Sequence, residues 1–192
     1  MTTFFALLAL AANVATLLLA VAAAGGRSEA GRRFRSEVLA LFAGWELWTA
    51  FIVATSATLG SLYLSEIAHF VPCQFCWYQR IAMYPLAVML GIAAWRHDHG
   101  VRIYVSVIAA IGAGLSTYHY LIQRFPDLDS GSCSLGVPCT TAYVMKFGFM
   151  TIPYMAFSGF TLILALMWAD RCGSREATPS FTPTSDRKDE QR

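Results

Sequence analysis

The sequence predicts an all-α integral membrane protein, and two observations carry this prediction. Of the 192 residues, 56% are apolar and only 14% are charged, whereas soluble domains have roughly 25% charged residues. The apolar residues are gathered in runs of about 20, which is the length that a helix needs to cross a bilayer. The net charge is only +2 and the arginines form no continuous basic face, so nucleic-acid binding is not indicated.

Five segments have the length and composition of membrane-spanning helices. They cover residues 3–24, 39–64, 77–95, 103–122 and 147–169. The first segment lacks the basic amino-terminal region of a cleaved signal peptide, so we interpret it as a retained helix, although small residues follow it. In the second, Trp45 and Trp48 predict that Glu46 lies at the membrane interface, with a buried functional carboxylate as the alternative. Pro85 predicts a kink in the third segment.

Five segments connect or follow these helices, and the one between the second and third helices is a short outer loop at residues 65–75. Residues 26–37 form a short basic connection, and residues 96–102 form a compact turn. We interpret the two histidines and the aspartate of this turn as solvated, with a metal site as the alternative. Residues 123–146 form a longer loop, and the tail 170–192 is rich in Pro, Ser and Thr, which predicts disorder.

The distribution of basic residues predicts which ends of the helices face the cytoplasm. If segments 26–37 and 96–102 and the tail 170–192 lie inside, eleven of the fourteen Lys and Arg residues are cytoplasmic. The predicted organisation is an additional amino-terminal helix with its connection (1–36), a membrane domain (37–169) and a disordered cytoplasmic tail (170–192).

The same topology separates the five cysteines into two groups. It places Cys73, Cys76, Cys133 and Cys139 on the outer face, where disulfides persist, and Cys172 on the inner side, where thiols stay reduced. Two dithiols on one face indicate a relay, because one pair can pass electrons to the other by thiol–disulfide exchange. A structural zinc site from the four outer cysteines is the alternative, although their spacing is unlike that of zinc ribbons; we expect no metal.

The Cys-x-x-Cys pair lies at the start of the third predicted helix. Free N–H groups at a helix start favour a thiolate, which we expect at Cys76. Arg80 follows one turn later and can stabilise that thiolate or a reduced acceptor beside it; snorkelling to lipid phosphates is the alternative. A lipid-soluble acceptor such as a quinone needs only a groove and a few polar groups. His119 can supply one of these groups or can be a satisfied interhelical residue.

Four segments taken together resemble the DsbB/BdbC family of quinone-linked disulfide-bond oxidases, especially its BdbC branch. They are GSLYLSEI at 60–67, PCQFCWYQRIAMYPL at 72–86, YHYLIQ at 118–123 and FGFMTIP at 147–153. The resemblance covers roughly residues 45–168. It implies a four-helix transmembrane bundle in a bacterial cell membrane, to which the helix at 3–24 is an addition.

The resemblance also implies a function and a role for each site residue. Cys73 and Cys76 match the quinone-linked pair, with Cys76 nearest the ring, and Arg80 and His119 match residues beside the quinone (ubiquinone or menaquinone). The loop cysteines, Cys133 and Cys139, match the pair that exchanges with an extracytoplasmic thioredoxin-like oxidase (DsbA/BdbD-like), and Cys133 resembles the cysteine that is attacked. In this scheme the protein reoxidises that partner and passes the electrons to the quinone.

Three other functions remain open from the sequence. A vitamin-K-epoxide-reductase-like enzyme has similar chemistry, but there the loop cysteines precede the Cys-x-x-Cys. A carrier of reducing equivalents needs cysteines that meet a cytoplasmic donor, for which only the unpaired Cys172 is available. A non-enzymatic scaffold would merely be cross-linked by its outer disulfides.

Overall fold

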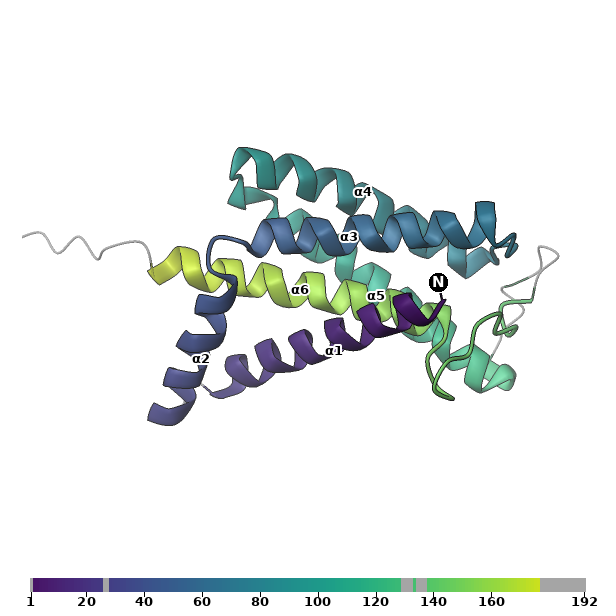
Figure 1. Ribbon diagram of the computed structural model, residues 1–192, viewed down its shortest axis with the longest axis horizontal. Helices are drawn as coiled ribbons and strands as arrows, with labels where there is room; N and C mark the ends of the chain where they lie inside the picture. Colours follow the sequence, from purple (N-terminus) through teal and green to yellow (C-terminus); the bar gives the residue numbers. More distant parts are fainter. Residues whose placement is uncertain (1, 26–27, 129–132, 134–137, 177–192) are drawn as a thin grey trace, which may run out of the picture.

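The computed structural model describes residues 2–25, 28–128, 133 and 138–176. Six α-helices account for most of these residues: α1 Thr2–Ala24, α2 Glu29–Phe42, α3 Glu46–Leu62, α4 Gln74–Arg96, α5 Arg102–Arg124 and α6 Ile152–Glu176. Five of them run side by side along the length of the molecule, while α2 stands across one end (Figure 1). The described part of the chain contains one isolated β-bridge and no strand, so the predicted all-α class is confirmed.

Four helical segments among the described residues have the length and composition to cross a membrane. They are Thr2–Ala24, Glu46–Ile67, His99–Arg124 and Ile152–Gly173. The helix α4 is not one of them by composition, because its first turns contain Gln74, Gln79 and Arg80. It has 23 residues, which corresponds to about 35 Å at ~1.5 Å per residue, and it packs between α3 and α5. The helices α3–α6 therefore form the predicted four-helix bundle, and α1 packs against α6 as an additional helix.

Close packing between α5 and α6 holds the centre of the bundle together. Phe160 of α6 is fully buried, and a Cβ atom built on Gly112 of α5 would lie 2.4 Å from its ring. Gly112 therefore lets the two helices approach closely. Small residues have this role in membrane helices generally, because lipid tails are as apolar as the side chains and packing, not the hydrophobic effect, drives association.

The amino-terminal region differs from the prediction. Residues 29–42 form α2, whose start is capped by the Ser28 side chain accepting from the Gly31 N–H, so the predicted basic connection is largely helical. Gly44, at φ +79°, turns the chain before α3 begins at Glu46 instead of Leu39. Glu46 was predicted to lie at the interface; it is only 7% exposed, because it packs at the end of the bundle near Gly173.

The last helix also has different bounds from those predicted. Phe147 and Gly148 adopt positive φ angles in a turn closed by the Lys146–Met150 bridge, so α6 begins at Ile152. It continues to Glu176, past the predicted end at 169, and residues 177–192 of the predicted tail lie outside the described residues. Its buried Asp170 bonds His99 at 2.6 Å, so this histidine of the predicted solvated turn has a structural partner.

Candidate functional site

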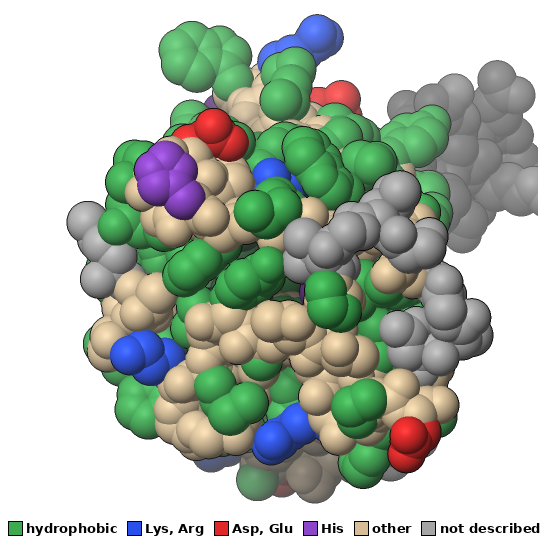
Figure 2. All heavy atoms as spheres, turned by 90° about the vertical axis from the view of Figure 1, so that its right-hand side faces the viewer, with side chains coloured by type: hydrophobic (Ala, Val, Ile, Leu, Met, Phe, Trp, Pro, Cys, Tyr) green, Lys and Arg blue, Asp and Glu red, His purple; other side chains and the backbone are tan. Residues whose placement is uncertain are grey.

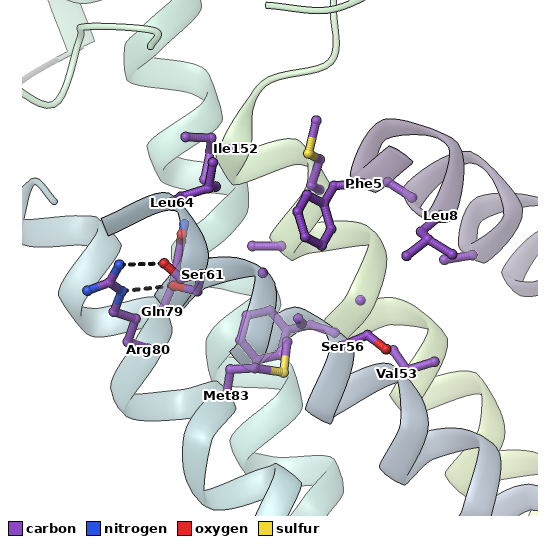
Figure 3. Close-up of a pocket in the computed structure, with 18 of the residues that line it drawn as sticks. Phe5, Leu8, Val53, Ser56, Ser61, Leu64, Gln79, Arg80, Met83 and Ile152 are labelled. Atoms are coloured by element: carbon purple, nitrogen blue, oxygen red, sulfur yellow. Dashed lines mark hydrogen bonds between the residues drawn. The ribbon is translucent and has the colours of Figure 1, made fainter. Parts of the chain in front are cut away.

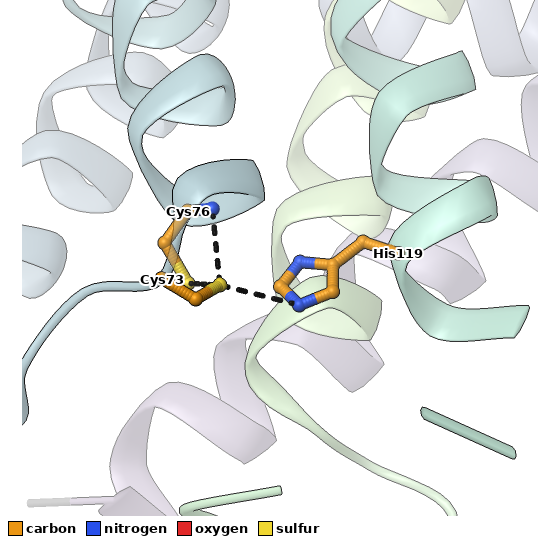
Figure 4. Close-up of side chains that lie close together, drawn as sticks. All are labelled: Cys73, Cys76 and His119. Atoms are coloured by element: carbon orange, nitrogen blue, oxygen red, sulfur yellow. Dashed lines mark hydrogen bonds between the residues drawn. The ribbon is translucent and has the colours of Figure 1, made fainter. Parts of the chain in front are cut away.

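The site is built around the start of α4, at the end of the bundle opposite α2 (Figure 1). Cys73 is the N-cap residue of this helix, and its sulfur accepts a hydrogen bond from the Cys76 N–H at 3.4 Å. The two sulfur atoms lie 2.9 Å apart as a dithiol (Figure 4). The N-cap position makes Cys73, not Cys76 as expected, the sulfur that receives the free N–H groups at the helix start.

The surroundings of Cys73 favour its thiolate. The hydrogen bond from the Cys76 thiol is the largest effect, and His119 adds to it, while burial opposes both; together they lower the pKa of Cys73 to about 4. A thiolate at neutral pH is the form that attacks disulfides. The side chain is nevertheless only 5% exposed, so attack on it from solution requires a partner that reaches into the structure.

His119 of α5 joins this pair. Its Nε2 atom lies 3.5 Å from the Cys73 sulfur and its Nδ1 atom lies 3.3 Å from Gln79 Nε2. The ring of Phe75 packs against the histidine, with centroids 5.6 Å apart. His119 is 1% exposed, so its orientation is fixed by these contacts, and Figure 4 shows the ring edge directed at the sulfur.

The second cysteine pair lies on the same side of the dithiol as His119. Cys133 and Cys139 form a disulfide with their Cα atoms 5.8 Å apart. Cys139 belongs to the same buried cluster as Cys73, Phe75 and Ile122, and Cys133 packs against this cluster. The two pairs are therefore neighbours, as a relay requires.

The alternative of a zinc site from four cysteines does not fit this geometry. Two of the four form a disulfide and offer no thiolate. Among the described residues, one other group has side chains close enough to share a metal ion. It consists of Cys73, Cys76 and His119, whose ligand atoms lie within 4.8 Å of one another, and it contains neither loop cysteine.

Arg80 lies one turn beyond Cys76, and its guanidinium is held by α3. Its Nε–H donates to Ser61 Oγ at 2.8 Å and its Nη2–H donates to the Ser61 carbonyl at 2.9 Å. The guanidinium also lies 5.1 Å from the centroid of the Trp77 ring. These contacts fix the cation within the protein, unlike the flexible position of a residue that snorkels to lipid. A π-helical turn, Tyr63–Ile67, follows directly after this part of α3.

A cavity of about 420 Å³ opens beside Cys76 and Arg80 (Figure 3). Its polar lining is confined to a few side chains, which include Ser61, Gln79 and Arg80; most of the rest is apolar and comes from α1, α3, α4 and the start of α6. A volume of this size and a mostly apolar lining with a few polar groups are typical of small-molecule sites.

A much smaller hollow lies on the other side of the dithiol. Cys73, Cys76, His119 and Gln123 line it together with residues of the loop that precedes α6. Cys76 lines both spaces, whereas Cys73 lines only the smaller one. The two sulfur atoms of one dithiol thus face two different surroundings.

The sequence identified six candidate residues, and the structure brings them together at one end of the bundle. The sequence-based prediction missed three residues that position these six. Ser61 holds Arg80, Gln79 contacts His119, and Phe75 packs on the His119 ring. Gln79 had a weak signal, because it lies one turn after Cys76 on the same helix. Ser61 lies in the family-like segment 60–67, but nothing in that segment indicates a contact with Arg80. Cys172 lies at the opposite end, where Arg35 donates to its sulfur at 3.3 Å.

Fold and site together define a class: a helical membrane protein with a dithiol and a disulfide side by side at one end of its bundle. The family described as disulfide bond formation protein DsbB matches residues 45–174. Disulfide bond formation protein C of Bacillus subtilis is 46% identical over 134 residues, covering 69% of this chain and 93% of that protein. Probable disulfide formation protein C 1 of Bacillus anthracis is 48% identical over 120 residues, covering 62% and 86%.

The chain belongs to the disulfide bond formation protein DsbB family, which confirms the predicted resemblance. No solved structure matches this chain. The family match begins at Trp45, so α1 and α2 lie outside it.

Proposed function

We propose that this protein is a membrane thiol oxidase that reoxidises an extracytoplasmic thioredoxin-like protein and passes the electrons through its two cysteine pairs to a membrane quinone. The names of the related proteins refer to disulfide formation, which supports thiol chemistry for this protein. The single observation that carries the proposal is the arrangement around the dithiol: Cys73 clusters with Cys139 of the disulfide, while Cys76 lines the apolar cavity with Arg80.

The exchange steps follow from this arrangement. A partner thiolate attacks Cys133, which forms a mixed disulfide and releases Cys139 as a thiolate. Cys139 then attacks the sulfur of Cys73 in an oxidised Cys73–Cys76 pair, which forms a Cys73–Cys139 disulfide and releases Cys76 as a thiolate. The second thiol of the partner resolves the mixed disulfide, so the partner leaves oxidised and Cys133 remains reduced. Cys133 then attacks Cys139, which restores the loop disulfide and frees Cys73.

At this point the protein holds the state that the structure describes, with a loop disulfide and a Cys73–Cys76 dithiol. A quinone in the cavity supplies the oxidising power, since it accepts two electrons and two protons from this dithiol. The protein's own groups assist: the Arg80 cation lies where negative charge develops, and His119 can exchange a proton with Cys73. The Cys73–Cys76 disulfide is then restored.

The end of the molecule that carries the cysteines offers a surface for a protein partner. Figure 2 looks onto this end and shows hydrophobic side chains spread across it, with basic and acidic ones scattered among them. Exposed apolar residues on the segments at this end include Ile67, Val71, Phe125, Met145 and Phe147. Exposed apolar side chains gathered at one end of a molecule mark a candidate site for interaction with a protein partner.

The distribution of basic residues supports a topology in a bacterial cytoplasmic membrane with this end outside. Among the described residues, seven of the ten Lys and Arg residues lie at the opposite end, on α2, around the turn between α4 and α5, and near the end of α6. Both cysteine pairs then face the oxidising compartment. Cysteine-accessibility labelling in intact cells checks this side for Cys133 and Cys139, with a membrane-impermeant reductant to open their disulfide followed by a membrane-impermeant thiol reagent.

Quinone reduction by the purified protein, with a reduced thioredoxin-like protein as donor, tests the function. We expect turnover that requires both pairs and stops in Cys76→Ser. Unchanged turnover in Cys76→Ser would contradict the proposed route.

A trapping experiment separates an exchange protein from a cross-linked scaffold. In Cys139→Ser, Cys133 is a free thiol, so the partner is supplied without its second cysteine and with its attacking cysteine held as a disulfide with a small thiol. The Cys133 thiolate attacks the partner's sulfur and releases the small thiol, and the partner then has no second thiol that could resolve the adduct. We expect this mixed disulfide to persist without reductant, and Cys133→Ser with Cys139→Ser should form none at the loop. Failure to trap any adduct would favour the scaffold.

A further inference from the structure

We propose that α1 is a wall of the acceptor cavity and binds the isoprenoid tail of the quinone. This inference rests on the proposed function and extends it, because α1 lies outside the segment that matches the family. It assigns a role to a helix that neither the family match nor the cysteine chemistry explains.

The residues of α1 form a continuous side of the cavity. Phe5, Ala9, Ala12 and Ala15 line it, and their spacing of three to four residues places them on one face of the helix. Three of the four are alanines, so this face leaves room that larger side chains would fill. Figure 3 shows α1, with Phe5 and Leu8, across the cavity from Ser61, Gln79 and Arg80.

The two sides of the cavity differ in polarity. The α1 side contributes only apolar side chains, whereas Cys76, Gln79, Arg80 and Ser61 lie on the side of α3 and α4. A ligand that fills both parts therefore has a polar, reactive head and a hydrocarbon extension. A quinone with an isoprenoid tail has this form, and its ring would lie at Cys76 with the tail along α1.

Two contacts hold α1 in this place. The Phe5 ring lies so close to α3 that a Cβ atom on Gly60 would be 2.7 Å from it, and its centroid is 6.4 Å from that of Tyr63. Further along the helix, Asn13 Nδ2 donates to the Tyr154 hydroxyl of α6 at 3.3 Å. The first contact joins α1 to α3 and the second joins it to α6, so the rotation of α1 about its axis is fixed and the alanine face remains directed at the cavity.

A lipid acyl chain has the same chemistry as an isoprenoid tail and could also occupy the α1 side. The continuity of the cavity from the α1 face to Cys76 and Arg80 favours the quinone, because a single ligand then fills the space with its head at the redox-active sulfur.

The test uses the full chain and two acceptors: a long-tailed quinone and a benzoquinone with the same ring and no tail. Ala12→Trp fills the α1 side of the cavity, and Ala20→Trp is the matched control, since Ala20 is an exposed alanine of α1 that does not line the cavity. We expect Ala12→Trp to raise the KM for the long-tailed quinone about tenfold or more and to leave the KM for the tailless acceptor and both kcat values near wild type. Ala20→Trp should change neither.

Other outcomes overturn the inference in distinguishable ways. If Ala12→Trp raises the KM for both acceptors equally, the α1 side contacts the quinone ring. If it changes neither KM value, a lipid chain or nothing occupies the α1 side. If the wild-type protein reduces no quinone, the proposed function fails and the inference fails with it. Ala12→Leu repeats the test with a smaller side chain should the tryptophan variant not fold. Photo-crosslinking by a quinone with a tail-borne diazirine gives a readout apart from turnover, and we expect the label on α1 peptides.

Discussion

The Cys73 sulfur and the His119 Nε2 atom lie 3.5 Å apart, although 46 residues separate them in the chain. The other ring nitrogen, Nδ1, faces the amide nitrogen of Gln79 at 3.3 Å. An amide nitrogen is a donor, so an Nδ1 atom that accepts from it leaves the Nε2–H group to face the sulfur. The contact with Gln79 therefore orients the ring so that it can donate to a Cys73 thiolate.

The first prediction concerns the pH dependence of alkylation at Cys73 in the protein with its dithiol reduced. At pH values below an ordinary pKa near 8.5, the alkylation rate of a cysteine rises about tenfold for each unit that the pH increases, because its thiolate fraction grows. The pKa of Cys73 is lowered to about 4. We therefore expect a rate that is nearly constant from pH 6 to 8 and that falls only as the pH approaches 4.

Rates are measured by mass spectrometry of the peptide that carries Cys73, with the same protein in denaturant as the control. A rate that rises steeply between pH 6 and 8 in the folded protein would contradict the prediction. Reduced and folded protein should also lose stability as the pH falls toward 4, because a group whose pKa is lowered by folding stabilises the fold only while it is ionised.

The second prediction concerns His119→Ala. The substitution removes one of the donors to the Cys73 sulfur but leaves the Cys76 thiol in place, so the pKa of Cys73 should rise without reaching its ordinary value. We expect the alkylation rate at pH 6 to fall several-fold and the rate at pH 9 to stay unchanged. Gln79→Leu, which frees the tautomer of the ring, should give a smaller change in the same direction. Equal loss at both pH values would indicate altered access to Cys73.

The third prediction concerns Arg80, whose guanidinium is held by Ser61 through two hydrogen bonds. We expect Arg80→Ala to lower kcat for quinone reduction by about 10²-fold, a typical loss when a preorganised electrostatic group is removed. Arg80→Lys should recover only part of this, because lysine keeps the charge but cannot reproduce the two-pronged bond.

Trapping of a mixed disulfide at Cys133 is the control for this experiment, since Arg80 plays no part in that exchange. It should be unchanged in both Arg80 variants. Loss of membrane insertion in Arg80→Ala would instead assign Arg80 to lipid anchoring. Ser61→Ala removes one bond and leaves the bond to the backbone carbonyl, and its effect on kcat should lie between those of wild type and Arg80→Ala.

The fourth prediction concerns packing between α5 and α6. In Gly112→Ala the new methyl group would meet the Phe160 ring at 2.4 Å, and overpacking of this kind destabilises by about 1–3 kcal/mol. Gly114→Ala is the matched control, two residues away on the same helix, because a Cβ atom there has no neighbour within 4 Å. Alanine should be neutral at Gly114, or stabilising by up to about 1 kcal/mol. The measurement is the unfolding midpoint in detergent; equal midpoints for the two variants would contradict the prediction.

The sequence predicted the long helices well because the lipid environment imposes a composition that local sequence reveals. It did not predict α2, because residues up to 37 were assigned to a connection on the strength of their arginines and residues 39–42 were assigned to the following span. It did not predict that Glu46 is buried against its neighbours, because flanking tryptophans indicate depth in the membrane but not which side of a helix faces the other helices. The helix bounds at Glu46 and Ile152 depend on positive-φ turns at Gly44 and Phe147, two residues that lie within helices predicted from the sequence.

The sequence predicted the residues of the candidate site that carry chemistry, but it did not predict the residues that hold them in place. Spacing and family motifs identify the residues that carry chemistry, such as Cys76 and Arg80. The residues that hold them come from other helices: Ser61 reaches Arg80 across 19 positions and His119 reaches Cys73 across 46. Such contacts are set by packing of the whole bundle. The contact between Phe5 and Gly60 also depends on helix packing, and the residues around either position do not predict it.

The two sulfur atoms of the dithiol, 2.9 Å apart, face different spaces, with Cys73 in the small hollow and Cys76 also lining the apolar cavity. In the proposed reaction this arrangement insulates the two half-reactions from each other. A thiol dissolved in water cannot meet an oxidant dissolved in lipid, so the oxidant is not consumed by unspecific thiols. In the proposed reaction, electrons from a protein partner therefore reach the quinone through the loop disulfide and then through the Cys73–Cys76 pair.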